Sequence, residues 1–125
     1  MTMAERGLAY ARAFPTRPPL TIATEQGRDV LYGHWVIGQD YKNRSPFYGA
    51  YPHGYLDRVR AIFPDAARTL HAFSGSLPAG PYVRCDLLQP ADISCNVYEI
   101  GAHWRGRPFD LIIADPPYSP LDAER

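Results

Sequence analysis

The fold is decided by the stretch Pro108-Phe109-Asp110-Leu111-Ile112-Ile113-Ala114-Asp115-Pro116-Pro117-Tyr118-Ser119. Within it, an unbroken apolar run from Leu111 to Ala114 ends at an acidic residue followed by two prolines. A parallel strand that is covered on both faces reads as such an aliphatic run. The prolines end the strand because neither has an N–H to donate to a neighbouring strand. The pattern therefore predicts a buried parallel strand with Asp115 at its carboxyl end, where open α/β sheets bind their ligands.

The four residues after this strand, Asp115 to Tyr118, resemble the Asp-Pro-Pro-Tyr motif of amino-group methyltransferases that use S-adenosylmethionine. An exocyclic amine on a base is a poor nucleophile, because its lone pair is delocalised into the ring. The resemblance implies that Asp115, with a carbonyl of Pro116 or Pro117, accepts hydrogen bonds from the amine and favours a pyramidal nitrogen. Tyr118 would then stack on an extruded base. The structural alternative is an ordinary Pro-Pro turn after a core strand.

Three further short strands precede this one, and a helix precedes them all. Residues 55–63 place apolar side chains at the i, i+3/i+4 spacing of an amphipathic helix, with Asp57, Arg58 and Arg60 on the opposite side. The expected strands cover residues 69–73, 82–86, 93–96 and 109–114. We therefore predict an α/β fold, a partial Rossmann-like methyltransferase sheet of about four strands.

Taken in order, residues 47–119 resemble the γ-type DNA adenine N6-methyltransferases. The resemblance implies that the fourth strand pairs with the first, and that S-adenosylmethionine binds over the strand ends. Asp86 would accept from the ribose hydroxyls, and Asn96 would meet the adenine of the cofactor. Physical chemistry supports such a site, since a glycine at a strand-to-helix turn allows close backbone approach and a carboxylate can accept from both ribose hydroxyls. The residues expected to bind the cofactor are Tyr48, Gly49, Phe73, Ser74, Gly75, Asp86 and Asn96.

The sequence departs from the family pattern at several points. Leu77 stands where a second glycine is expected, and Asn96 replaces a carboxylate. The stretch between Phe73 and Asp86 leaves no room for a helix, because it contains two prolines and a helix under three turns is marginal. We expect residues 47–125 to be the front part of a seven-stranded sheet, an N-terminal fragment that is incomplete by itself. Its last strand would then be an exposed apolar edge that favours self-association.

Residues 1–46 are expected to form a partly irregular N-terminal extension that begins with a poorly ordered arm. Within it, residues 4–14 can form a short helix that ends before Pro15. Two possible strands, at residues 20–23 and 30–32, are separated by the turn-like sequence Glu25-Gln-Gly-Arg-Asp.

Composition sets mild bounds on function. The chain has 125 residues and no net charge. Residues 1–70 hold nine Lys and Arg against six Asp and Glu, and the remainder holds four against seven. This asymmetry permits a nucleic-acid partner without requiring one. No segment has the length of a signal peptide's apolar core or of a membrane span, so we expect a cytoplasmic protein that does not enter a membrane.

The metal-ligating residue types lack the spacing of a metal site. Cys85 and Cys95 have no CxxC spacing, so we expect free, buried thiols in a reducing compartment. The four histidines are scattered along the chain, and no metal site is predicted from them.

Three functions remain open from the sequence. The first is methylation of the N6 amine of adenine in DNA, with the adenine flipped out of the duplex. The second is methylation of the N2 amine of guanine in RNA, since a similar motif serves there. The third is a catalytically inactive module that binds nucleic acid or the cofactor.

Overall fold

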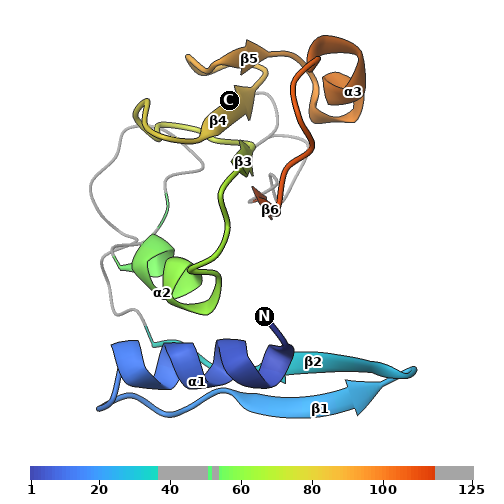
Figure 1. The fold of residues 1–125 in the computed structure, drawn as a ribbon. Helices are drawn as coiled ribbons and strands as arrows, with labels where there is room; N and C mark the ends of the chain where they lie inside the picture. Colours follow the sequence, from blue (N-terminus) through green and yellow to red (C-terminus); the bar gives the residue numbers. More distant parts are fainter. Residues whose placement is uncertain (37–50, 52–53, 115–125) are drawn as a thin grey trace. The chain divides into compact units, whose positions relative to one another are not determined.

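The computed structural model describes residues 1–36, 51 and 54–114 (Figure 1). The chain divides into two compact units. Met1–Gln39 and Pro52–Asp65 make the first, which we call the N-terminal unit. Asp40–Tyr51 and Ala66–Arg125 make the second, which we call the sheet unit.

The N-terminal unit begins with helix α1, Met3–Ala13. Thr2 and Glu5 form a capping box, in which each side chain accepts from the backbone N–H of the other residue at 3.1 Å. The cap satisfies two of the backbone N–H groups that every helix start leaves without an intrahelical partner. A short helix was expected here, but the expectation of a poorly ordered arm is wrong, because this start is capped and Tyr10 is fully buried.

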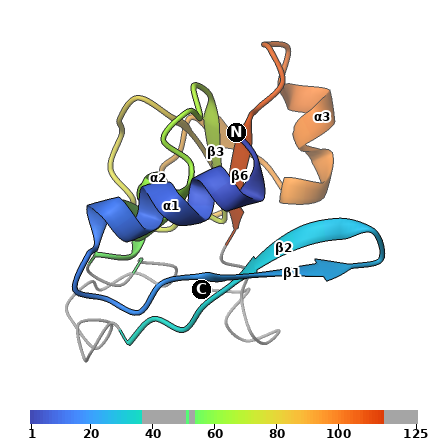
Figure 2. The same cartoon turned by 60° about the horizontal axis from the view of Figure 1, so that its bottom comes forward.

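A β-hairpin follows α1, and the helix lies against it (Figure 2). Strands β1, Thr21–Glu25, and β2, Arg28–Tyr32, pair antiparallel. The two turn residues, Gln26 and Gly27, both have positive φ, at 50° and 74°. Two left-handed residues in a two-residue loop match the twist of the strands they join. The two possible strands and the turn between them are therefore confirmed, and the structure adds that the strands pair as a hairpin.

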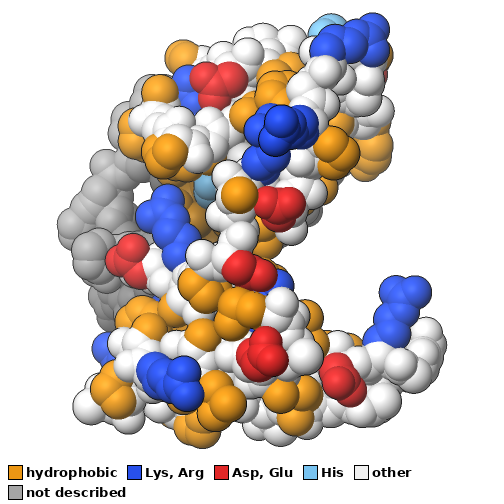
Figure 3. Space-filling view, viewed as in Figure 1, with side chains coloured by type: hydrophobic (Ala, Val, Ile, Leu, Met, Phe, Trp, Pro, Cys, Tyr) orange, Lys and Arg blue, Asp and Glu red, His pale blue; other side chains and the backbone are white. Residues whose placement is uncertain are grey.

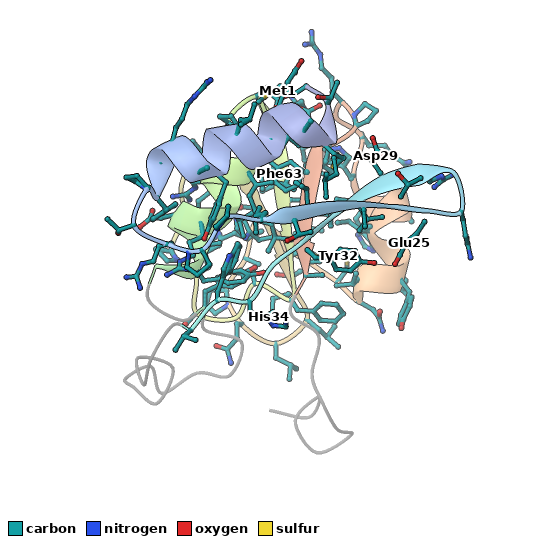
Figure 4. The ribbon with its side chains drawn as sticks, turned by 90° about the horizontal axis from the view of Figure 1, so that it is seen from below. Met1, Glu25, Asp29, Tyr32, His34 and Phe63 are labelled. Carbon is teal, nitrogen blue, oxygen red and sulfur yellow. The ribbon has the colours of Figure 1, made fainter. Side chains whose placement is uncertain are left out.

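Side chains also link the two hairpin strands. The hydroxyl of Tyr32 donates to Glu25, and both residues carry labels in Figure 4. This hydrogen bond, with a smaller contribution from burial, raises the pKa of Tyr32 above its usual value. The Thr24 hydroxyl donates to Asp29 at 2.9 Å. These contacts lie on the exposed side of the hairpin, so they add little to the stability of the unit.

Helix α2, Tyr55–Ile62, packs against α1 and completes the N-terminal unit. Arg58 was expected on the solvent side of this helix, and that expectation is wrong, since only 8% of the residue is exposed. Its guanidinium carbon lies 5.6 Å from the ring centroids of both Phe14 and Trp35. A guanidinium is weakly hydrated and stacks on aromatic faces, so it can be buried where aromatic rings surround it.

The sheet unit contains four parallel strands in the spatial order β5-β4-β3-β6. In chain order these are β3, Thr69–Ala72; β4, Val83–Asp86; β5, Ile93–Ser94; and β6, Leu111–Ala114. Leu70 of β3 is in register with Val83 of β4 and with Ile112 of β6. The four predicted strands and the pairing of the fourth with the first are confirmed. The fold is mixed α/β with a four-stranded parallel sheet, compatible with part of a Rossmann-like fold.

The core of the sheet unit lies on one face of the sheet. Leu70, Cys85 and Cys95 are buried at its centre, and the 3-10 helix η2, Val97–Glu99, and helix α3, Ile100–His103, follow β5 beside it. The two cysteines are free and buried, as predicted, with their sulfur atoms 3.8 Å apart. Burial, and secondarily the hydrogen bond with Cys95, raise the pKa of Cys85 to about 12. A thiol with that pKa stays protonated at neutral pH, so Cys85 contributes packing rather than reactivity.

The opposite face of β3 carries His71, of which 1% is exposed. The rings of Tyr51 and Tyr82 meet it edge to face, with centroids 5.5 Å and 4.7 Å away. The hydroxyl of Tyr51 lies 3.0 Å from Nδ1 of His71. Residues 73–82, which connect β3 to β4, form no helix, as the prolines predicted. Aromatic side chains therefore pack on this face where a crossover helix commonly packs.

Strand β6 differs in one respect from the prediction. Its Ile113 is buried, but 60% of Ile112 is exposed. The expectation of a strand covered on both faces is therefore wrong. Ile113 lies on the face that carries buried His71, whereas Ile112 lies on the face of Leu70, where the core cluster does not extend over it.

No helix among residues 1–36, 51 and 54–114 has the length and apolar character needed to cross a membrane. Acidic, basic and apolar side chains are interspersed over the face drawn in Figure 3.

Candidate functional site at the carboxyl edge of the sheet

The four parallel strands end at one edge of the sheet, which we call the carboxyl edge. Phe73, Ser74 and Gly75 follow β3 there, Asp86 is the last residue of β4, and Asn96 lies two residues beyond β5. The fold thus brings together all the predicted site residues that lie in the described part of the chain. The other predicted site residues lie outside it: Tyr48, Gly49, Asp115, Pro116, Pro117 and Tyr118.

The strand order reverses within this sheet. From β3 the chain moves to β4 and then β5 on one side, and β6 returns to the other side of β3. Connections on the two sides of such a point diverge, which leaves room at the carboxyl edge for a ligand. The loop after β3 and the end of β6 flank this switch point. Ala114 of β6 pairs with Ala72 of β3, so the residue that precedes Asp115 in the sequence is in register with the residue that precedes Phe73.

The loop after β3 turns sharply. Phe73 has a φ of 56°, a left-handed conformation that is uncommon for a residue with a side chain. Such a residue costs on the order of 1–3 kcal/mol and persists only where the surrounding structure enforces it. Here the N–H of Ser74 donates to the carbonyl of Cys85 at 3.1 Å, and Gly75 is again left-handed. The Oγ of Ser74 is buried without a hydrogen-bond partner among the described residues.

Asp86 organises this loop through its carboxylate. Oδ2 accepts from the N–H of Gly75 at 2.8 Å. Oδ1 accepts from the N–H groups of Leu88 and Gln89, both at 2.9 Å. One side chain therefore ties the loop after β3 to the turn after β4. Among the described residues, Oδ1 accepts from two donors and Oδ2 from one, so Oδ2 has a second lone pair without a described donor.

A second link between the same loops comes from Arg84. Its Nη1 donates to the carbonyl of Leu77 at 3.0 Å, and its Nε and Nη2 donate to the Asp92 carboxylate at 3.2 and 3.3 Å. Asp92 also accepts from the Arg84 backbone N–H at 2.9 Å. The side-chain hydrogen bond from Arg84 lowers the pKa of Asp92 below its usual value. Leu77, the residue that replaces the expected glycine, is thus held through its backbone carbonyl.

Asn96 is exposed and caps η2. Its Oδ1 accepts from the backbone N–H of Tyr98 at 3.0 Å. The side chain is held in one orientation at the carboxyl edge, because this hydrogen bond fixes which end of the amide faces the helix.

Sequence reasoning missed the apolar residues at this edge. Leu87, Leu88 and Tyr98 are 59%, 54% and 94% exposed, next to Asp86 and Asn96. The sequence did contain a signal for them. Leu87, an apolar residue, directly follows Asp86, and Tyr98 follows Asn96 by two positions. The carboxyl edge therefore offers both hydrogen-bonding groups and exposed apolar surface.

Among the described residues, no group of three or more His, Cys, Asp and Glu side chains could hold a metal ion. Comparisons with protein-family models, with curated proteins and with solved structures gave no match.

Proposed function

We propose that this protein transfers a methyl group from S-adenosylmethionine to the N6 amine of adenine in DNA. The observation that carries the proposal is the strand order β5-β4-β3-β6. It puts the strand that runs into Asp115-Pro116-Pro117-Tyr118 next to the strand that runs into the loop Phe73-Ser74-Gly75. A cofactor over β3 and a target base at the end of β6 would then be neighbours.

The described residues fit a nucleoside cofactor. Asp86 keeps an acceptor lone pair for a ribose hydroxyl, and Asn96 offers an amide at the same edge. Leu87 adds exposed apolar surface beside them. The Oγ of Ser74, buried without a described partner, is a further polar group in the loop that would approach the cofactor. Tyr48 and Gly49 are the proposed cofactor contacts that precede the sheet in the sequence.

The chemistry then needs a group that acts on the target amine. When bound, S-adenosylmethionine supplies a methyl group on a positively charged sulfur. The amine nitrogen would take this methyl group as the carbon–sulfur bond breaks, and the amine would then lose a proton to water. Asp115, with the carbonyl of Pro116 or Pro117, accepts from the amine hydrogens, and Tyr118 stacks on the flipped base.

Binding of the reaction product S-adenosylhomocysteine tests the cofactor site directly. Isothermal titration of the 125-residue chain should give saturable binding with one site per chain. Asp86→Asn is the matched variant, since it keeps one acceptor oxygen and nearly the same volume. Its affinity should fall, whereas a substitution on the hairpin such as Asp29→Asn should leave the affinity unchanged. Absence of binding by the folded parent chain rules out the proposed cofactor.

The reaction itself is tested by mass spectrometry of nucleosides from DNA and RNA treated with the protein and S-adenosylmethionine. N6-methyladenine from DNA is the product that would support the proposal, and it should be absent with Asp115→Ala. N2-methylguanine from RNA would support the other methyltransferase instead. Cofactor binding without either product would support an inactive cofactor-binding module.

A further inference from the structure

The parallel strands begin at a second edge of the sheet, which we call the amino edge. Arg68 directly precedes β3 there, and residues 104–110 lead from α3 into β6. The carbonyl of Arg68 accepts from the N–H of Asp110 at 2.8 Å and from that of Leu111 at 3.4 Å, so the two segments lie side by side. In Figure 2 the segment between α3 and β6 forms a loop that projects beyond the start of β6.

Trp104 holds this projecting loop in one shape. Its Nε1 donates to the carbonyl of Arg107 at 2.9 Å, and its ring centroid lies 4.9 Å from that of Phe109, which packs against the core cluster. A Cβ added at Gly106 would lie 2.4 Å from a ring carbon of Trp104, so only glycine allows this close approach. The loop therefore presents its exposed residues, Arg105 and Arg107, from an anchored turn.

The carboxylates at the starts of β5 and β6 already have partners. Asp92 directly precedes β5, and its Oδ2 accepts from Nε of Arg84 at 3.2 Å. Asp110 directly precedes β6, and its Oδ2 accepts from the backbone N–H groups of Ala67 and Arg68 at 2.9 and 3.0 Å. Both negative charges are therefore engaged within the protein.

The arginines beside them have no such partner. Among the described residues, the guanidinium groups of Arg105 and Arg107 form neither an ion pair nor a hydrogen bond. Nε of Arg68 is buried without a hydrogen-bond partner in the same part of the chain. The amino edge thus carries three positive charges that the described carboxylates do not pair.

We propose that the amino edge binds the phosphate backbone of a nucleic acid through Arg105 and Arg107, with Arg68 adding positive charge beside them. A guanidinium presents a planar fork of donors that matches the oxygens of a phosphate group. Small ligands bind in concave sites that enclose most of their surface, whereas a projecting turn suits a polymer that passes over it. Because the turn is anchored before binding, little conformational freedom is lost when it meets the polymer. The contact lies at the opposite end of the strands from the proposed cofactor site and does not rest on it.

The dependence of DNA binding on salt tests this contact. Fluorescence anisotropy of a labelled short duplex gives the affinity of the 125-residue chain over a range of salt concentrations. Each phosphate contact adds about −0.9 to the slope of log affinity against log salt concentration. The double variant Arg105→Gln with Arg107→Gln should therefore make the slope shallower by about 1.8. The loss should be equal for two duplexes of unrelated sequence, since phosphate contacts carry no sequence information.

Two matched variants separate the contact from net charge. Arg12→Gln with Arg17→Gln removes the same charge from exposed positions of the N-terminal unit and should leave the slope unchanged. Arg105→Lys with Arg107→Lys keeps both charges and should keep the slope, but it should weaken binding because a lysine lacks the planar fork. Urea unfolding checks that all three variants fold as the parent does.

Equal flattening of the slope by the two glutamine double variants would show that only net charge matters and would overturn the proposal. Absence of DNA binding by the folded parent would overturn it as well. Binding of the parent to vesicles of anionic lipid without binding to DNA would assign the amino edge to a membrane surface instead. The cofactor site is judged separately, because Arg105→Gln with Arg107→Gln should bind S-adenosylhomocysteine as the parent does.

Discussion

The two units of this chain are stabilised by different polar side chains. In the N-terminal unit the central groups are arginines: Arg58 is buried among aromatic rings, and Arg6 forms a two-pronged ion pair with Asp65 at 2.6 and 3.1 Å. In the sheet unit they are aspartates that accept from backbone N–H groups. Asp86 accepts from three such groups, and Asp110 accepts from those of Ala67 and Arg68.

The difference follows from what each unit must join. Two helices and a hairpin present side chains to one another, and a long guanidinium can reach several of them. Loops at the ends of parallel strands present free backbone N–H groups, and a short carboxylate accepts several of these at once. The comparison predicts that aspartate substitutions disturb loop geometry in the sheet unit, whereas arginine substitutions disturb packing in the N-terminal unit.

The largest effect is expected from Asp86→Ala. The substitution leaves the N–H groups of Gly75, Leu88 and Gln89 without their acceptor and releases the left-handed turn at Phe73. We expect the free energy of unfolding of the sheet unit to fall by about 3 kcal/mol. Hydrogen bonds to a charged group each contribute about 1.5–3 kcal/mol, and water replaces part of the three that are lost because the site is partly exposed.

Urea unfolding followed by amide hydrogen exchange measures this loss residue by residue. Asp86→Asn is the control, because one oxygen remains to accept from part of this set, and its loss should be smaller. Equal stability of the parent and Asp86→Ala would contradict the role given to this carboxylate.

The next effect is expected from Arg58→Ala in the N-terminal unit. It removes a guanidinium that touches Phe14 and Trp35 and lies 3.4 Å from the Tyr10 hydroxyl. The loss combines packing with cation–π attraction, which we expect to cost about 2 kcal/mol of unfolding free energy. Near-ultraviolet circular dichroism of the aromatic residues, followed during denaturation, measures this loss of unfolding free energy.

Arg58→Lys separates the two contributions, because it keeps the charge and loses the planar group. If Arg58→Ala weakened hydrogen-exchange protection in strands β3 to β6 as strongly as in α1, the division between the units would be contradicted.

The sequence predicted more of the sheet unit than of the N-terminal unit. Short apolar runs that end at a polar residue or a proline located β3, β4, β5 and β6 to within a few residues, and the resemblance supplied the pairing of β6 with β3. Such runs can be recognised from a few consecutive residues, and each strand of the parallel sheet contains one.

The burial of Arg58 had no such signal, because it depends on aromatic residues up to 48 positions away in the sequence, as its contact with Tyr10 illustrates. In the candidate site, the positions of Asp86 and Asn96 at strand ends were predictable from the sequence. Their hydrogen bonds were not, since each uses a backbone N–H whose direction is set by the fold of the following turn.

A smaller effect is expected on stability at acidic pH. The Arg6 hydrogen bond lowers the pKa of Asp65, and the Arg84 hydrogen bond lowers the pKa of Asp92. A carboxyl group whose pKa is lower in the folded state stabilises the protein fully above its unfolded pKa, near 4. That contribution is lost as the pH falls through the folded pKa. Both units should therefore lose part of their stability below about pH 4.

Asp65→Asn and Asp92→Asn test this in the two units separately. Each variant should show a shallower fall in melting temperature between about pH 5 and pH 2 than the parent, since one titrating carboxyl group is removed. The side chains of Asp65 and Asp92 are 43% and 41% exposed, so water screens both pairs and the differences should be small. A steeper acid dependence in either variant would contradict the assignment.

The smallest effect on stability, and the clearest on association, is expected at β6. Among the described strands β6 has a neighbour on one side, β3, and Ile112 is 60% exposed. An apolar strand of this kind favours pairing with a second copy of the chain. Ile112→Lys should change the unfolding free energy by less than about 0.5 kcal/mol, because an exposed side chain gains little from burial. It should lower self-association, since a charge on an edge strand opposes pairing with another chain.

Analytical ultracentrifugation over a range of concentrations measures this self-association, with Tyr98→Lys as the control for an exposed apolar residue away from β6. Equal reduction by both variants would show that general surface hydrophobicity, and not the edge of β6, drives the association.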